Sequence, residues 1–378
     1  MPSAPTHALI DRVSALRNRF GAAQIDALVV THVPNVVYLT NFSSTAAVLI
    51  VTRDDAVLIT DFRYLTAAQA LLTSAVAAPP CRLVPVERTY DETTVECLRR
   101  LGAARIGVEG AYLPVQKHER WRNALDGTGS TFVVTERLVE SGRIVKDAYE
   151  QRTVREAAQR LVSVAVQVLR LVAEGRKESD LAAEIDYALR IAGFERPAFD
   201  TIVASGPGTA LPHGRPGKRT LGRGDLVMLD FGGVYDGYCV DLTRTVSLGP
   251  PEFGQKRLHD AVATAQASAL SAIRPGVRAS DVDAAARDTL TRLGLGEAFG
   301  HSTGHGLGVE VHEEPRIAKR RPDAAEQDLV LMPGMVFTIE PGAYVPGTGG
   351  VRIEDDVLVT ENGCEVLTDG VTRELALD

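Results

Sequence analysis

Two aspartates lie in a pair of apolar segments that the sequence predicts to form one hairpin, LVMLDFGGVYDGYCVDLTRTV at 226–246. Asp236 and Gly237 stand between the two apolar runs, and an Asp-Gly pair in that setting favours a two-residue hairpin turn. If the residues that flank this turn pair with each other, Asp230 and Asp241 become diagonal neighbours on one face, because side chains alternate along a strand. The fold must therefore accommodate two carboxylates on one face of a largely apolar hairpin.

Such a pair of carboxylates needs a counter-charge. Two ionised carboxylates in apolar surroundings repel each other unless a cation or a proton lies between them. The alternative is that one of them, Asp241 for instance, is a turn or cap residue at a solvated edge. For the two together, the pattern favours a metal site.

Three histidines follow in a glycine-rich segment, GHSTGHGLGVEVHEEP at 300–315, as His301, His305 and His312. The glycines argue against a helix, and no glutamate follows the first histidine as in the helical zinc motif. We expect a bent strand or a loop that lets the backbone pass close to a ligand. The alternative, a phosphate-binding loop, is weak because no lysine follows the glycines.

Two glutamates are also carried by apolar strand patterns. Glu340 ends the apolar run MVFTIE, and Glu354 lies in GGVRIEDDVLV. In the second run Arg352 and Glu354 are expected on one face, with Val351 and Ile353 on the other. An Arg352–Glu354 ion pair is the alternative explanation for these two residues.

Together these patterns indicate a centre with two metal ions. Two aspartates and two glutamates carry four negative charges, which two divalent cations balance, and at least one histidine adds an imidazole. Oxygen ligands with one imidazole suit manganese, cobalt or zinc. Two such ions about 3.5–4 Å apart share a water, lower its pKa and polarise a carbonyl or phosphoryl group.

The composition excludes several other classes of protein. With 41 basic and 49 acidic side chains the formal net charge is −8, so a global basic surface for nucleic acid is absent. The four cysteines are scattered without a CxxC pair, which argues against a thiolate zinc site and for a reducing compartment. The first residues lack a signal-peptide pattern, and no run of about 18 apolar residues is long enough to span a membrane. We therefore expect a cytoplasmic protein.

The chain is expected to form two domains. Residues 1–140 alternate helical and strand patterns, including a hairpin at 46–60, and predict a compact α/β unit. Residues 145–378 begin with a long amphipathic helix over 146–174 and continue with glycine-rich strands interrupted by helices. This second part predicts an α+β domain, with helices grouped against an antiparallel sheet.

The candidate ligands resemble those of the metallopeptidases with the pita-bread fold, which include aminopeptidase P, prolidase and methionine aminopeptidase. The spacing Asp230-x10-Asp241, followed by His305, Glu340 and Glu354, is similar to the five-ligand set of that family without a substitution. The resemblance implies that Asp241 and Glu354 bridge both metals. It also implies that Asp230 binds one metal, while His305 and Glu340 bind the other.

Further matches resemble the branch of the family that cleaves Xaa-Pro bonds. Residues 1–140, and VPNVVYLTNF at 33–42 in particular, resemble the creatinase-like N-terminal domain that methionine aminopeptidases usually lack. The motif ALPHGRP, the glycine-rich segment and VRIED match segments that line the active site in this branch. The active-site residues implied by these matches are His213, His301, His312 and Arg352.

The resemblance implies an aminopeptidase P-like enzyme that hydrolyses the Xaa-Pro bond at peptide N-termini with a metal-bridging hydroxide. Glu340 would shuttle the proton, His213, His301 and His312 would bind substrate, and Arg352 would orient Glu354 and His312. The implied cofactors are two divalent ions, Mn²⁺ with Co²⁺ or Zn²⁺ as alternatives. The implied partners are a peptide with proline at its second position and a second copy of the chain, without nucleic acid or membrane.

Other functions remain open at this point. Prolidase, which cleaves only Xaa-Pro dipeptides, is the first alternative. A non-catalytic scaffold that binds a partner protein is more remote, since all five ligand positions are retained. A phosphodiesterase is disfavoured because no basic residues cluster beside the ligands in the sequence.

Overall fold

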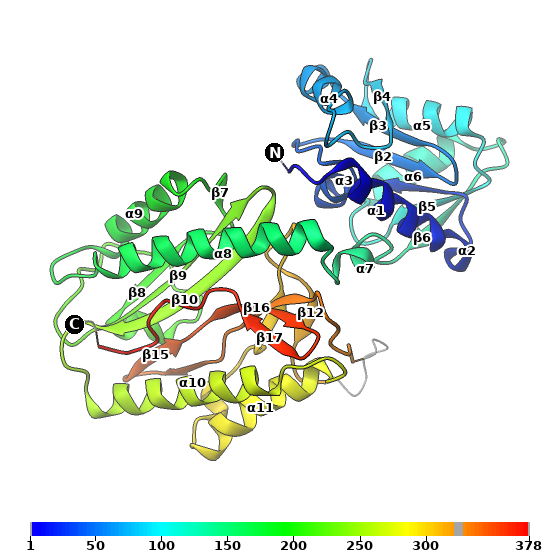
Figure 1. Ribbon diagram of the computed structural model, residues 1–378. Helices are drawn as coiled ribbons and strands as arrows, with labels where there is room; N and C mark the ends of the chain where they lie inside the picture. The colour runs from blue at the N-terminus through cyan, green and yellow to red at the C-terminus, as the bar shows by residue number, and fades with distance from the viewer. Residues whose placement is uncertain (1, 321–327, 377–378) are drawn as a thin grey trace. The chain divides into compact units, whose positions relative to one another are not determined.

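The computed structural model describes residues 2–320 and 328–376, and they form two compact units, Met1–Arg143 and Ile144–Asp378 (Figure 1). The division falls within the stretch where the sequence analysis expected a domain boundary. Among the described residues, no helix combines the length and the apolar character that crossing a bilayer requires.

The first unit is an α/β domain built on one six-stranded sheet with the order β4-β3-β2-β1-β5-β6. The pairs β1–β2 and β2–β3 are antiparallel, and the second of these is the hairpin predicted at 46–60. The strands are β1 (Ala27–Val30), β2 (Val48–Thr52), β3 (Ala56–Thr60), β4 (Arg82–Pro85), β5 (Arg105–Glu109) and β6 (Thr131–Thr135). The helices are α1 (Thr6–Asn18), α2 (Phe20–Ala23), α3 (Val33–Thr40), α4 (Leu65–Leu72), α5 (Tyr90–Leu101), α6 (Val115–Ala124) and α7 (Glu140–Arg143).

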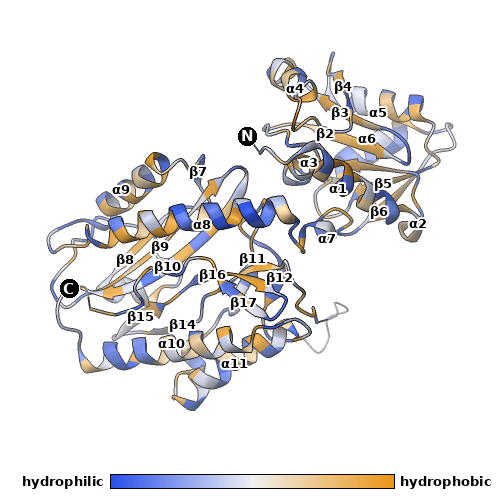
Figure 2. Ribbon diagram, in the orientation of Figure 1, coloured by the Kyte–Doolittle hydropathy of each residue, from blue (hydrophilic) through white to orange (hydrophobic). Residues whose placement is uncertain are grey.

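The core of this unit forms where the sheet meets α5 and α6. Val29 and Ile50 of the sheet belong to one buried cluster with Leu98 of α5 and Trp121 of α6. Figure 2 shows the strands mainly in the orange of hydrophobic residues. The short apolar runs of the sequence thus become strands because helices cover them.

The second unit is an α+β domain, as predicted. Its helices are α8 (Ala148–Leu169), α9 (Glu178–Ile191), α10 (Phe253–Ala272) and α11 (Ala279–Arg292), with the 3₁₀ turns η1 (Gly206–Ala210) and η2 (Gly296–Ala298). Its strands are β7 (Arg196–Pro197), β8 (Ile202–Ser205), β9 (Leu226–Tyr235), β10 (Tyr238–Ser247), β11 (Gly304–Gly306), β12 (Glu313–Ile317), β13 (Val336–Ile339), β14 (Gly342–Val345), β15 (Gly349–Arg352), β16 (Asp355–Thr360) and β17 (Gly363–Val366).

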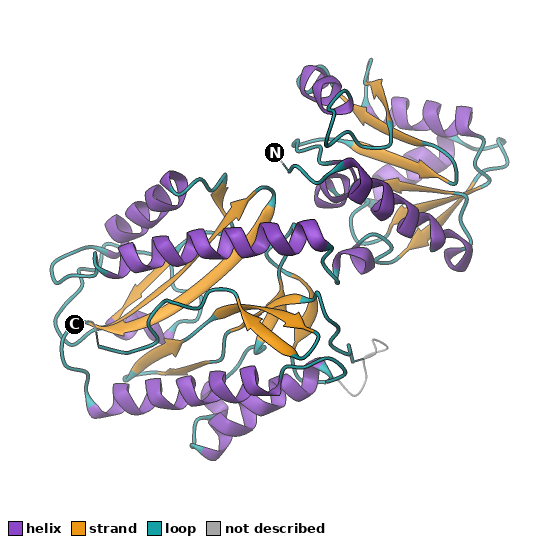
Figure 3. Cartoon of the chain, viewed as in Figure 1, coloured by secondary structure: helices purple, strands orange, loops and turns teal. Residues whose placement is uncertain are grey.

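The strands of this unit lie between two layers of helices. Figure 3 shows α8 and α9 on one side of the strands and α10 and α11 on the other. Helix α8 begins with a capping box, in which Asp147 and Glu150 each accept a hydrogen bond from the other's backbone N–H at 2.9 Å. Its apolar stripe, which includes Leu161 and Val168, is buried against the sheet. The helix ends at Leu169, earlier than the predicted end near Glu174.

The hairpin of β9 and β10 has the predicted register, with Asp230 paired to Thr243 and Asp241 paired to Gly232. Asp236 and Gly237 both have positive φ, 48° and 79°, as a two-residue type I′ turn requires. The turn residues therefore place both aspartates on one face of the hairpin.

A second sheet, with the order β12-β11-β13-β16-β17, carries His305 on β11, while Glu340 directly follows β13 and Glu354 directly precedes β16. Several hydrogen bonds join this sheet to the hairpin, and two of them come from backbone N–H groups at the candidate ligands. The Asp241 N–H donates to Asp356 Oδ2 at 3.0 Å, and the Glu354 N–H donates to the Thr243 carbonyl at 3.1 Å. The two sheets thus meet at the candidate ligands.

Candidate metal centre

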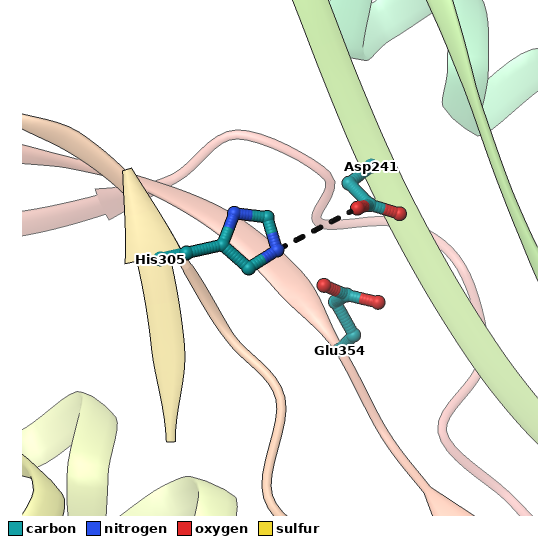
Figure 4. Close-up of side chains that lie close together, drawn as sticks. All are labelled: Asp241, His305 and Glu354. Carbon is teal, nitrogen blue, oxygen red and sulfur yellow. Dashed lines mark ion pairs between the residues drawn. The ribbon is translucent and has the colours of Figure 1, made fainter. Parts of the chain in front are cut away.

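Three side chains from three different strand regions converge at the junction of the two sheets. Asp241 lies on β10, His305 on β11 and Glu354 immediately before β16 (Figure 4). One ligand atom of each lies within 4.8 Å of the others. His305 is not helical, as its glycine neighbours predicted, because β11 is a short strand between Gly304 and Gly306.

The other two candidate ligands adjoin this group. Glu340 follows the last residue of β13, and its Oε1 lies 3.6 Å from His305 Nε2. Asp230 on β9 is 7% exposed and forms an ion pair with Arg352. The structure thus brings together the five residues singled out from the sequence, while their role as metal ligands stays a prediction.

The donor atoms of this cluster suit a cation. His305 Nδ1 lies 3.2 Å from the Gly306 carbonyl oxygen, which can only accept, so Nδ1 carries the proton and Nε2 presents a lone pair. That lone pair faces Asp241 Oδ2 at 3.9 Å and Glu340 Oε1 at 3.6 Å. Asp241 Oδ1 is buried and has no hydrogen-bond partner among the described residues. Acceptors that converge in this way are complemented by a positive ion.

Burial dominates the acid–base behaviour of the cluster. It raises the pKa of Glu340 to about 7, and the charge on Asp230 adds to the effect. Burial followed by neighbouring carboxylates raises the pKa of Asp241 and of Glu354 as well. Burial, with the charge of His312, lowers the pKa of His305 to about 4, so this imidazole is neutral at pH 7. Ionised carboxylates and a neutral imidazole are the forms that bind metals.

Arg352 connects several parts of the site. Its Nε donates to Thr243 Oγ1 at 3.2 Å, its Nη1 to the Tyr344 hydroxyl at 2.8 Å, and its Nη2 to Asp230. Thr243 Oγ1 in turn donates to Glu354 Oε2 at 2.5 Å. The alternative of an Arg352–Glu354 ion pair was wrong, because within the described ranges Arg352 forms its ion pair with Asp230, and Thr243 lies between Arg352 and Glu354.

Two of the three implied substrate-binding histidines, His301 and His312, adjoin the cluster. His301 Nδ1 lies 2.8 Å from the Ser302 carbonyl and its Nε2 lies 3.0 Å from the Tyr344 hydroxyl, while burial lowers its pKa to about 4. His312 packs edge-on against His305 at 4.3 Å between ring centroids. No hydrogen bond or ion pair joins Arg352 to His312 in the part of the chain that the structure describes, and the orientation of His312 by Arg352 stays a prediction. His213 lies in the loop after η1, and its charge contributes to lowering the pKa of both His301 and His312 after burial.

Sequence reasoning missed Tyr344. Its buried hydroxyl accepts from Arg352 and lies against His301, and burial raises its pKa to about 12. The only signal was its position in the GAYV segment after Glu340, between two clusters already singled out.

Three buried carboxylates, a fourth that is partly buried and one neutral imidazole lie at the junction of two sheets, and metallohydrolases bind divalent ions with centres of this kind. A profile of metallopeptidase family M24 matches residues 152–361, and a profile of the creatinase/prolidase N-terminal domain matches residues 12–145. The chain belongs to metallopeptidase family M24, which confirms the predicted family and its pita-bread fold with a creatinase-like N-terminal domain.

Similar proteins cover nearly the whole chain. An uncharacterized peptidase of Bacillus subtilis is 37% identical over 357 residues, which are 94% of this chain and 97% of that protein. An Xaa-Pro dipeptidase of Pyrococcus horikoshii is 35% identical over 356 residues, 93% of this chain and 94% of the relative. The solved structure of an Xaa-Pro dipeptidase from Bacillus anthracis has a TM-score of 0.90 at 36% identity and covers 98% of this chain and 100% of its own. The structure of an X-Pro aminopeptidase from Thermotoga maritima has a TM-score of 0.84 at 32% identity and covers 95% of this chain and 100% of its own.

Proposed function

We propose that this metallopeptidase is an Xaa-Pro dipeptidase, a prolidase, which releases proline from dipeptides. The observation that carries the proposal is the full-length similarity to proteins named Xaa-Pro dipeptidase, at 35% identity in sequence and a TM-score of 0.90 in structure. This similarity favours the prolidase alternative over the aminopeptidase P-like activity that the sequence analysis expected first.

Two divalent ions, Mn²⁺ or alternatively Co²⁺ or Zn²⁺, are the proposed cofactors. Asp241 and Glu354 would bridge them, Asp230 would hold one, and His305 and Glu340 the other. The converging lone pairs of this cluster and its raised carboxyl pKa values support such a site. When bound, the ions supply the Lewis acid that polarises the scissile carbonyl and the low-pKa water that attacks it.

Glu340 is the proposed proton carrier. Its carboxyl group directly follows β13 beside the cluster, with Oε1 3.6 Å from His305 Nε2, and a carboxyl group at that place can accept a proton and later donate it. It would take a proton at Oε1 or Oε2 from the attacking water and deliver it to the leaving prolyl nitrogen. His301 Nδ1 lies 4.0 Å from Glu340 Oε2, so the imidazole lies beside this carboxyl group.

The three histidines would bind and orient the substrate. The Ser302 carbonyl accepts from His301 Nδ1, so His301 Nε2 is an acceptor, and the Tyr344 hydroxyl donates a hydrogen bond to it. This chain of hydrogen bonds begins at Arg352, which fixes the ring. His213 and His312 would contribute donors to the developing oxyanion and to the substrate backbone.

The test is a comparison of proline release from Ala-Pro with cleavage of Ala-Pro-Ala and Ala-Ala, each with Mn²⁺ and with a chelator. We expect Mn²⁺-dependent cleavage of Ala-Pro and little cleavage of the other two. Cleavage of Ala-Pro-Ala at a similar or higher rate would favour the second candidate, an aminopeptidase P-like enzyme. The similarity to the Thermotoga maritima X-Pro aminopeptidase supports this candidate. Equal cleavage of Ala-Ala would contradict both.

A further inference from the structure

The loop that carries His213 is attached to the protein at both of its ends by one buried carboxylate. The loop runs from the end of β8 at Ser205, through η1, to Gly217. It contains no strand, and Leu211 within it is 62% exposed. A loop of this kind holds a functional imidazole in place only if its ends are fixed.

Glu178, at the start of α9, binds both ends. Its Oε1 accepts from the Ser205 N–H at 2.8 Å and from the Ser205 hydroxyl at 2.6 Å. Its Oε2 accepts from the Gly217 N–H at 3.0 Å. A Cβ at position 217 would lie 3.3 Å from this oxygen, so glycine allows the close approach. One side chain thus closes the loop.

The middle of the loop is attached to the metal cluster. The Pro212 carbonyl accepts from Arg352 Nη1 at 3.1 Å, and Arg352 is paired with Asp230. Thr209 Oγ1 accepts from the Gly350 N–H at 2.9 Å. With the ends held by Glu178 and the residue before His213 held by Arg352, the imidazole has a defined position relative to the cluster.

We propose that Glu178 is a positioning residue, which acts on the reaction by holding the His213 loop in its active geometry. Glu178 is 5% exposed, and the hydrogen bonds that its side chain makes among the described residues all go to the two ends of the loop. The proposal rests on the proposed function insofar as His213 binds substrate. The attachment of the loop itself does not depend on the substrate.

The first test is kinetic. Glu178→Gln keeps the size of the side chain but replaces one acceptor with an amide N–H₂, so one loop end loses its bond. We expect kcat/KM for Ala-Pro to fall by about tenfold or more, since small misplacements of binding groups have effects of that order. The stoichiometry of Mn²⁺ is expected to stay unchanged. Asp180→Asn, the same chemical change at an exposed site in the first turn of α9, is the matched control and should leave kcat/KM unchanged.

The second test separates positioning from general destabilisation. In a His213→Ala background, Glu178→Gln should cost less than about twofold, because residues that act through one another are not additive. Two losses that multiply would overturn the proposal.

The third test needs no activity. Hydrogen exchange measured by mass spectrometry should speed up in residues 206–217 of Glu178→Gln, with other peptides unchanged. Ser205→Ala removes one donor and keeps the carboxylate, so exchange in the same residues should speed up by a smaller factor. This variant replaces Glu178→Gln in the test if Glu178→Gln does not fold. Unchanged exchange in this loop would overturn the inference. Faster exchange with a wild-type protein inactive on Ala-Pro would instead show that the proposed function has failed.

Discussion

Glu340→Gln should stabilise the metal-free protein at pH 8 while it abolishes activity. Burial raises the pKa of Glu340 from its ordinary value of 4.5 to about 7. A group with a raised folded pKa contributes stability below its unfolded pKa and loses it as the pH rises through the folded pKa. Between pH 4.5 and 7 the free energy of unfolding of the metal-free protein therefore falls by about 3 kcal/mol. The figure follows from about 1.4 kcal/mol for each tenfold change in proton affinity.

The neutral amide of the variant removes this cost. We expect the free energy of unfolding of the variant to exceed that of the metal-free wild type by about 3 kcal/mol at pH 8. For a domain of this size this corresponds to a Tm that is about 6–12 °C higher. At pH 5 the folded wild type is protonated at Glu340, and the difference should shrink to about 1 kcal/mol or less. Excess Mn²⁺ should reverse the order, because the variant has lost a metal ligand.

Differential scanning calorimetry in a chelator is the suitable assay, because the single tryptophan, Trp121, lies in the first unit and does not report on the second. Glu361→Gln, at an exposed position, is the control and should show no pH-dependent gain. A Glu340→Gln variant that is no more stable than the wild type at pH 8, or one with the same gain at both pH values, would refute the reasoning.

Three further predictions concern buried contacts around the site. Lys146→Met should lower the free energy of unfolding by about 3–5 kcal/mol, because the Lys146–Glu313 pair has side chains that are 0% and 6% exposed; a loss below about 1 kcal/mol in chemical denaturation would contradict this. Arg352→Lys should lower kcat/KM for Ala-Pro by about tenfold or more with two Mn²⁺ still bound, because an ammonium cannot reproduce the guanidinium fork; unchanged kinetics would count against it. Tyr344→Phe should lower kcat/KM by about tenfold, because it removes the hydroxyl that joins Arg352 to His301, and a variant with wild-type kinetics would show that this link has no role.

The hairpin at the centre of the site could be predicted from the sequence because its turn is local. Asp236 and Gly237 accept positive φ, and that turn alone fixes the register of ten residues on each side. Asp230 and Asp241 therefore lie on the same face of the hairpin, as predicted. Glycines at 304 and 306 likewise argued correctly against a helix around His305.

Contacts between distant segments could not be predicted in the same way. Nothing local distinguishes Glu354, two residues away, from Asp230 as the partner of Arg352. The choice is made when the two sheets meet and Thr243 comes between Arg352 and Glu354. The role of Glu178 could not be predicted for the same reason. A glutamate in the first turn of an amphipathic helix is common, and its hydrogen-bond partners come close only when the loop folds.

The most direct test of the account is a titration of Mn²⁺ into chelator-treated protein, with bound metal and proline release from Ala-Pro measured on the same samples. We expect two Mn²⁺ to bind per chain and hydrolysis to reach its maximum as the second site fills. Asp241→Ala, which removes a proposed bridging ligand, should bind less than one equivalent and release no proline. Full hydrolysis without metal, or two bound ions without hydrolysis of Ala-Pro, would contradict the account.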